Sequence, residues 1–87
     1  MKDVLTFGRG VVSSHKYSVG VASIVEMTEN MYAVLATDKD GWLLYSRNFA
    51  FTDNCKKEVM KDCRRLYNSV RDHMSKKRLD LLDTLDD

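Results

Sequence analysis

The sequence has little of what marks a secreted, membrane-spanning or disordered protein. It contains two cysteines, four glycines and no apolar run near the roughly 18 residues that a membrane span needs. Its 87 residues are 44% hydrophobic and 31% charged, a balance that argues against wholesale disorder and suits a single core. Residues 1–8 are too polar for a secretory signal. We therefore expect one cytoplasmic domain with no membrane partner.

Residues with catalytic or metal-binding chemistry are few and widely spread. Cys55 and Cys63 lie in one predicted helix, where a rise of 1.5 Å per residue separates their Cα atoms by roughly 12 Å, too far for a disulfide. Cys63 and His73 are about 15 Å apart by the same rise, and nothing local brings His15 to a cysteine. Buried thiols and surface histidines are the simpler interpretation. We expect no catalytic residue, no metal, no cofactor and no enzymatic activity.

Residues 11–51 show the alternating pattern of β-structure. Mostly apolar residues stand at every second position from Tyr17 to Met27, with small or polar residues between them, and this pattern predicts one strand. Residues 31–37 are predicted as a second strand and residues 42–51 as a third. Residues 38–41 form the clearest turn, with Gly41 available for a positive φ. Residues 1–10 are an N-terminal arm or an edge strand. The predicted fold is a single α+β domain, in which a three- or four-stranded antiparallel sheet (a β-meander) is covered by a long C-terminal helix.

The predicted hairpin would have apolar residues on both faces. With Thr37 opposite Trp42, Leu35 and Leu44 share the face of Trp42, and the other face carries residues such as Tyr45. One helix cannot cover both faces. The face of Trp42 then needs cover from the N-terminal arm, the C-terminal tail or a second copy of the chain. We therefore expect a dimer or larger homo-oligomer, whose interface contains Trp42, Leu44, Leu35, Leu82 and Leu85.

Residues 53–78 predict a basic amphipathic helix. Apolar residues recur there at steps of three and four, and Thr52 or Asp53 can cap its first turn. Residues 79–87 form an acidic tail that contains leucines. The tail predicts a short amphipathic helix, either separate from the first or continuous with it.

Charge is unevenly distributed along the chain. Residues 1–54 carry five basic and six acidic side chains, whereas residues 55–78 carry nine basic and three acidic ones. Residues 79–87 carry four acidic side chains and no basic one. The formal net charge of +1 therefore conceals a basic helix followed by an acidic tail.

One flank of the predicted helix is basic without acidic residues, whereas the other can pair its charges at i,i+3 and i,i+4 spacing. The basic flank extends about 21 Å from Lys57 to Arg71, a length that spans several backbone phosphates. A solvated face that keeps the protein soluble is the alternative. We expect contact with nucleic acid through Lys57, Lys61, Arg64, Asn68, Arg71 and Arg78.

Residues 47–52, Arg-Asn-Phe-Ala-Phe-Thr, lead from a strand into a helix that begins with lysines. This order over residues 17–67 is similar to that of the arm-type DNA-binding domains of phage integrases, although the strands here are apolar rather than basic. The compact chain of mixed charge is also similar to the small accessory proteins that bacteriophages use against host systems. These resemblances imply nucleic-acid binding or a viral role, and a viral protein of this kind would lie in the host cytoplasm.

The expected function is that of a small non-enzymatic accessory protein. It would bind nucleic acid, with RNA or a ribonucleoprotein favoured over DNA, as would suit a phage-type inhibitor of a host toxin, nuclease or defence complex. Aromatic residues on the sheet add a hint of base stacking, although core packing explains most of them better. The alternative is a protein–protein inhibitor or adaptor that uses the apolar sheet face or a sheet edge, with the basic helix on an acidic protein surface.

Overall fold

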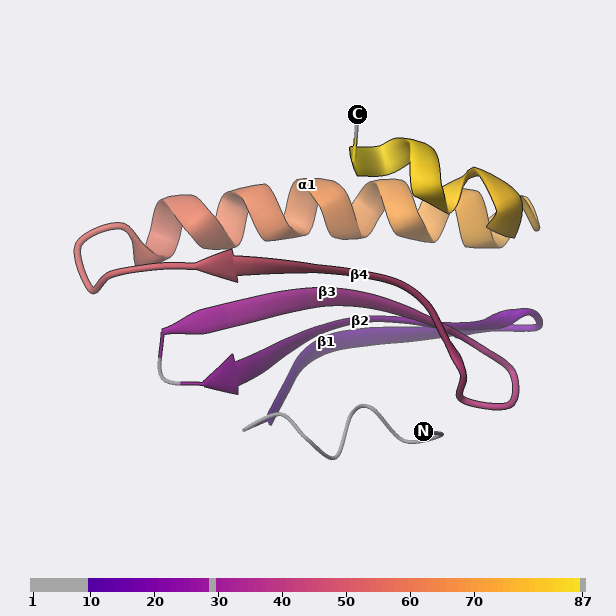
Figure 1. Cartoon of the computed structure of the whole chain (residues 1–87), viewed down its shortest axis with the longest axis horizontal. Coiled ribbons are helices and arrows are strands. Elements are labelled where there is room, and N and C mark those ends of the chain that lie inside the picture. The colour runs from indigo at the N-terminus through magenta and orange to yellow at the C-terminus, as the bar shows by residue number, and fades with distance from the viewer. Residues whose placement is uncertain (1–9, 29, 87) are drawn as a thin grey trace.

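The computed structural model describes residues 10–28 and 30–86, which form a four-stranded antiparallel sheet with one long helix across it (Figure 1). Each strand pairs with the next one along the chain, so the sheet is a meander in the order β1-β2-β3-β4. The predicted α+β class is confirmed. The elements are β1 (Gly10–Tyr17), β2 (Gly20–Thr28), β3 (Met31–Asp38), β4 (Leu43–Ala50), the helix α1 (Lys56–Ser75) and the 3₁₀ helix η2 (Leu79–Asp86).

The segment predicted as one strand from Tyr17 to Met27 contains a turn. Tyr17 pairs with Gly20, and the two residues between them connect β1 to β2. The sequence pattern does not reveal this turn, because Val19 keeps the alternation of apolar residues in phase between Tyr17 and Val21. Residues 10–17 are therefore a separate edge strand, which makes the fourth strand of the sheet. The prediction of an arm or edge strand at residues 1–10 lies outside the described residues, except for Gly10, which begins β1.

The turn at residues 38–41 is confirmed. The Asp38 carboxylate accepts hydrogen bonds from the backbone N–H groups of Asp40, at 2.9 Å, and Trp42, at 3.0 Å. Gly41 takes a φ of 89°, a left-handed conformation that glycine adopts without the steric cost of a Cβ.

The predicted pairing beyond this turn is wrong. Thr37 pairs with Leu43 and Ala36 with Tyr45, so Leu44 is an extra residue in β4. Such an extra residue is a β-bulge, which changes the direction of the side chains next to it. Leu44 packs into the core beneath α1 instead of sharing a face with Trp42 and Leu35.

The main core lies between the sheet and α1. Alternate residues of β2 and β3, among them Ile24 and Val34, face the apolar stripe of the helix, where Val70 and Met74 are fully buried. Cys63 is also buried there, as predicted for a core thiol. The opposite face of the sheet has a smaller buried cluster of Val25, Ala33 and Leu35. Both faces of the sheet thus hold buried apolar residues, as the sequence predicts.

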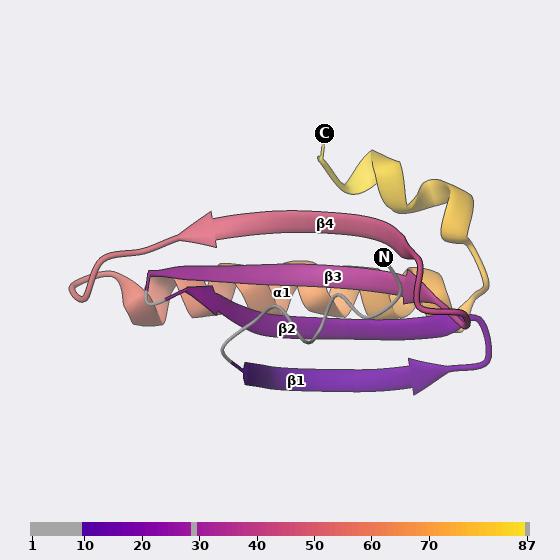
Figure 2. The same ribbon diagram turned by 60° about the horizontal axis from the view of Figure 1, so that its bottom comes forward.

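The boundaries of α1 differ from those predicted. Its N-cap residue is Cys55, which makes no side-chain capping hydrogen bond, so Thr52 and Asp53 do not cap the helix. At the other end Lys77 adopts a left-handed φ of 58°, and the N–H groups of Lys77 and Arg78 donate to the carbonyls of Met74 and His73. This is the Schellman arrangement that ends helices. The chain then folds back, and η2 packs beside α1 and the edge of β4 as a separate helix (Figure 2).

Candidate nucleic-acid interface

The basic flank of α1 lies along the side of the helix that faces β1. Lys57, Lys61, Arg64 and Asn68 are exposed, and Arg71 is half-buried. They recur at steps of four and three residues, so a helix of 3.6 residues per turn places them in one row. Because the apolar stripe anchors α1 on the sheet, this row keeps a fixed position relative to β1.

Arg71 is the most constrained residue of the row. Its Nε donates a hydrogen bond of 2.9 Å to the hydroxyl of Tyr17 in β1. Its Nη2 lies 3.4 Å from Nδ1 of His15, and its guanidinium carbon lies 5.5 Å from the ring centroid of Tyr67. The hydrogen bond that Arg71 donates to Tyr17 raises the pKa of Arg71 above its ordinary value, so the side chain keeps its charge. The cation is therefore held in place at the junction of α1 and β1.

Arg64 forms a second link between the helix and β1. Its Nη1 donates to the hydroxyl of Ser13 across 3.3 Å. Ser13, His15 and Tyr17 alternate along β1, so all three face the same side of the sheet as α1. The rings of His15 and Tyr17 lie against each other, with their centroids 4.5 Å apart. The row on α1 is thereby extended by a polar strand that has no acidic residue between Gly10 and Tyr17.

We call this combined region the α1–β1 surface. It consists of Ser13, His15, Tyr17, Lys57, Lys61, Arg64, Asn68 and Arg71.

The cations of the α1–β1 surface have no acidic partner within ion-pair distance among residues 10–28 and 30–86. Ion pairs occur instead on the opposite flank of α1. Arg65 lies 3.9 Å from Asp62, and Lys76 lies 3.2 Å from Asp72. The pairs predicted at i,i+3 and i,i+4 are thus confirmed. The helix has one balanced flank and one basic flank.

Arg78 is separated from the row. The helix ends at Ser75, so the rotation of 100° per residue does not extend to Arg78. It lies beyond the left-handed turn at Lys77, and its backbone N–H closes the end of α1. The row therefore ends at Arg71, because a tight turn replaces the helical geometry on which the prediction for Arg78 depends.

The residues expected in an apolar interface do not form one surface. Leu82 is 1% exposed and, like Leu44 and Leu85, packs with the core beneath α1. Leu35 belongs to the cluster on the opposite face of the sheet. Only Trp42, which is 51% exposed, remains a large accessible apolar residue of this set.

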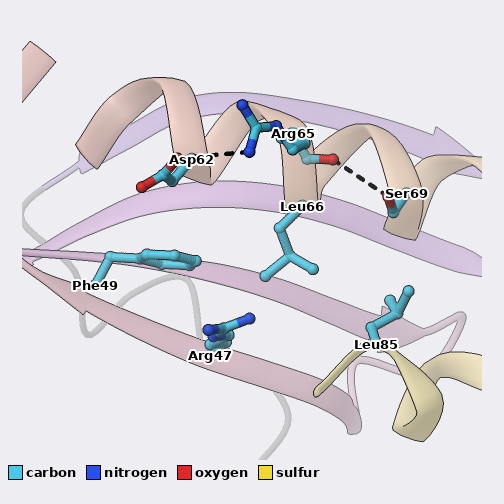
Figure 3. Close-up of a pocket in the computed structure, with 7 residues that line it drawn as sticks. All are labelled: Arg47, Phe49, Asp62, Arg65, Leu66, Ser69 and Leu85. Carbon is cyan, nitrogen blue, oxygen red and sulfur yellow. Dashed lines mark hydrogen bonds and ion pairs between the residues drawn. The ribbon is translucent and has the colours of Figure 1, made fainter. Parts of the chain in front are cut away.

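A groove of about 310 Å³ lies on the balanced flank of α1, between β4 and η2 (Figure 3). Arg47 and Phe49 of β4 line its floor, and Leu85 of η2 stands at one end. The pattern of residues along the sequence does not predict this groove or the β1 half of the α1–β1 surface. The absence of acidic residues from Gly10 to Tyr17 is a signal that could have indicated the latter. The complete lining is Arg47, Phe49, Asp62, Arg65, Leu66, Ser69 and Leu85.

The two thiols have different environments and do not approach each other as a pair. Burial raises the pKa of Cys63 to about 11. The pKa of Cys55 is lowered, because its sulfur accepts hydrogen bonds from the hydroxyl and the backbone N–H of Thr52. Within the described residues, no three His, Cys, Asp or Glu side chains gather as metal ligands would. Nor does any helix there have the length and hydropathy needed to cross a membrane.

Comparison of the chain with protein-family models, with curated proteins and with solved structures gives no match, so function is inferred from the geometry of the described residues alone.

Proposed function

We propose that this chain is a non-enzymatic protein that binds the phosphate backbone of nucleic acid through the α1–β1 surface. The observation that carries the proposal is the row of four cations on one flank of α1, two of which also contact β1, with no acidic partner in the described part of the chain. Cations of this kind bind phosphates favourably, because binding releases the counterions that are condensed on the nucleic acid.

The dimensions of the surface suit a backbone. The row from Lys57 to Arg71 covers about 21 Å at 1.5 Å per residue, so one strand can present several phosphates to it. Hydrogen bonds to Ser13 and Tyr17 hold Arg64 and Arg71 in place before binding. Less side-chain entropy is then lost in the complex than for two freely moving arginines. Lys57 and Lys61 extend the same surface as point charges.

A salt series tests the proposal. Replacing Lys61 and Arg64 with Gln removes two phosphate contacts, so binding should weaken to a similar degree for unrelated sequences. The slope of log affinity against log salt should become shallower by about two. Gel shifts with generic RNA and generic DNA measure both quantities, and their comparison shows which nucleic acid is preferred. RNA is the expected preference.

The matched control replaces Arg65 and Lys76 with Gln. These two substitutions remove the same charge from the opposite flank, where both residues already have acidic partners. The control should bind nearly as the parent does. An equal loss in the control would mean that overall charge, and not the α1–β1 surface, attracts the ligand. A parent chain that binds neither RNA nor DNA at about 50 mM salt contradicts the proposal, since electrostatic binding is strongest at low salt.

A further inference from the structure

The outer edge of β4 presents backbone groups with which no other strand of the described residues pairs. β4 is the last strand of the sheet, and the N–H of Phe51 just beyond it donates to the carbonyl of Asn30. In an antiparallel ladder the groups that face the neighbouring strand alternate along the chain, so those of Ser46, Asn48 and Ala50 face away from β3. All three residues are exposed.

From Tyr45 to Ala50 this edge lacks a bulge, a proline and a lysine, three of the features that block strand addition. The register with β3 is regular from Tyr45 to Ala50, because the single bulge lies earlier, at Leu44. The same stretch contains neither proline nor lysine. A regular exposed edge of this kind is a template for another strand.

The groove lies directly beside this edge, on the side of the sheet that carries α1 (Figure 3). Phe49, Leu66 and Leu85 give it an apolar lining. A strand added to β4 would direct every second side chain toward this side, with about 7 Å between successive ones. The groove can therefore receive side chains from a strand on the edge.

The charge of the groove favours an acidic partner. Arg47 has no acidic partner among the residues that the structure describes, and its guanidinium carbon lies 5.1 Å from the ring centroid of Phe49. Arg65 and Asp62 form a long pair of 3.9 Å whose side chains are 82% and 58% exposed, so water screens it strongly. With two guanidinium groups and one carboxylate, the groove has an excess of positive charge, which an added carboxylate would neutralise.

We propose that β4 takes up an extended peptide segment of a partner protein as a fifth strand. An apolar side chain of the segment contacts Phe49, Leu66 and Leu85, and an Asp or Glu two positions away pairs with Arg47 and Arg65. The site lies on the opposite flank of α1 from the α1–β1 surface, so it does not depend on the proposed nucleic-acid binding. A chain with both sites would connect a protein to a nucleic acid.

Two synthetic libraries of eight-residue peptides provide the probe. One has an apolar residue at position 3, Asp or Glu at position 5 and Thr elsewhere, and the other has Lys at position 5. The full chain should bind peptides of the acidic library at least about tenfold more tightly, the difference expected of a charge-assisted hydrogen bond. Arg47→Gln should remove most of that preference. Equal binding of both libraries, or of neither, overturns the proposal.

Asn48→Pro tests the strand pairing itself. Proline removes an N–H that faces away from β3, where an edge strand tolerates it, so the variant should fold and lose the peptide. Asn48→Thr replaces the same side chain but keeps the N–H, and it should bind as the parent does. Peptide binding by folded Asn48→Pro at the affinity of the parent contradicts the proposal.

Hydrogen exchange on the parent chain covers the case in which Asn48→Pro does not fold. The backbone N–H groups of Ser46, Asn48 and Ala50 should become protected when the peptide binds, and unchanged exchange contradicts strand addition. If the parent is a dimer that Asn48→Pro or Asn48→Thr dissociates, a second copy occupies the edge and the proposed partner is wrong. RNA and DNA binding should be unchanged in Asn48→Thr, which separates this site from the α1–β1 surface.

Discussion

Gly20 begins β2 and lies against the backbone of β3, where it pairs with Asp38. A Cβ built on this residue would collide with the carbonyl oxygen of Thr37 and lie 2.9 Å from the Cα of Asp38. Both atoms belong to the backbone of β3, which cannot rotate away as a side chain can. Glycine is required here by this lack of space and by its positive φ of 157°, which L side chains rarely adopt.

Gly20→Ala should therefore destabilise the fold by about 2 to 3 kcal/mol, because the clash must be relieved by moving paired strands. Gly10→Ala is the matched control, since nothing lies within 4 Å of a Cβ at that position. Urea denaturation of both variants measures the difference in the free energy of unfolding. A loss below about 0.5 kcal/mol for Gly20→Ala, which is typical of surface positions, would contradict the close packing of β2 on β3.

The two cysteines should differ in reactivity, because only a thiolate attacks alkylating reagents. Cys55 is partly exposed and has a lowered pKa, whereas burial raises the pKa of Cys63 to about 11. Iodoacetamide at pH 8 should modify one thiol per folded chain, and mass spectrometry should locate it at Cys55. The rate should rise with pH, with its midpoint below pH 9.0, the ordinary pKa of a thiol.

Thr52→Val provides the control for this pH dependence. It removes the hydroxyl that contacts the Cys55 sulfur at 3.3 Å and keeps the backbone N–H. The midpoint should then move to higher pH. Preferential labelling of Cys63 in the folded chain would contradict its burial in the core.

At the scale of elements, the sharp end of α1 determines where the tail packs. The left-handed residue Lys77 reverses the chain, and the reversal allows η2 to bring Leu79, Leu82 and Leu85 against α1 and β4. A continuous helix would direct these leucines into solvent. The acidic tail is thus part of the core through its leucines.

Lys77→Gly should stabilise the fold by about 0.5 kcal/mol. A side chain in the left-handed region costs roughly 1 to 2 kcal/mol, and the greater entropy of glycine in the unfolded chain offsets part of the gain. Lys76→Gly is the matched control, since it removes the same charge next door at a φ of −94° and should destabilise. Thermal unfolding followed by circular dichroism compares the two. A lower melting temperature for Lys77→Gly would contradict the left-handed conformation.

At the scale of the whole molecule, the reasons for expecting a dimer have changed. The tail leucine Leu82 and the second-face residue Leu35 are 1% and 5% exposed in a single chain. Among the described residues two pairs of large apolar side chains stay exposed: Val11 and Val12, at 49% and 40%, and Trp42 and Leu43, at 51% and 47%. Trp42 belongs to the predicted interface, so the corner that it forms with Leu43 is the remaining candidate. The predicted dimer thus stays a prediction that now depends on this corner of the sheet.

We therefore expect self-association to involve Trp42 and Leu43. Sedimentation at micromolar concentration should give a dimer for the parent chain and a monomer for the double variant Trp42→Ser, Leu43→Ser. Both side chains are half exposed, so the variant should remain folded. A monomeric parent would contradict the expected dimer.

Patterns along the sequence were sufficient to predict the kinds of element and much of their order. Alternation in residues 11–51, the turn that ends at Gly41 and the apolar stripe of residues 55–74 are local features, with periods set by strand and helix geometry. The charge pairs on one flank of α1 follow from the same periodicity. For that reason the α+β class, the buried Cys63 and the basic row could be found without a structure.

Tertiary contacts decided the features that join distant parts of the chain. The bulge at Leu44 depends on how β4 fits β3, and the turn at Ser18 and Val19 is masked by a pattern that continues through it. The contact of Arg71 with Tyr17 joins residues 54 positions apart. The groove beside β4 likewise needs the strand, α1 and η2 together. The basic row could be predicted, but its union with β1 and the groove could not, because sequence periodicity orients side chains within an element and only packing determines which elements meet.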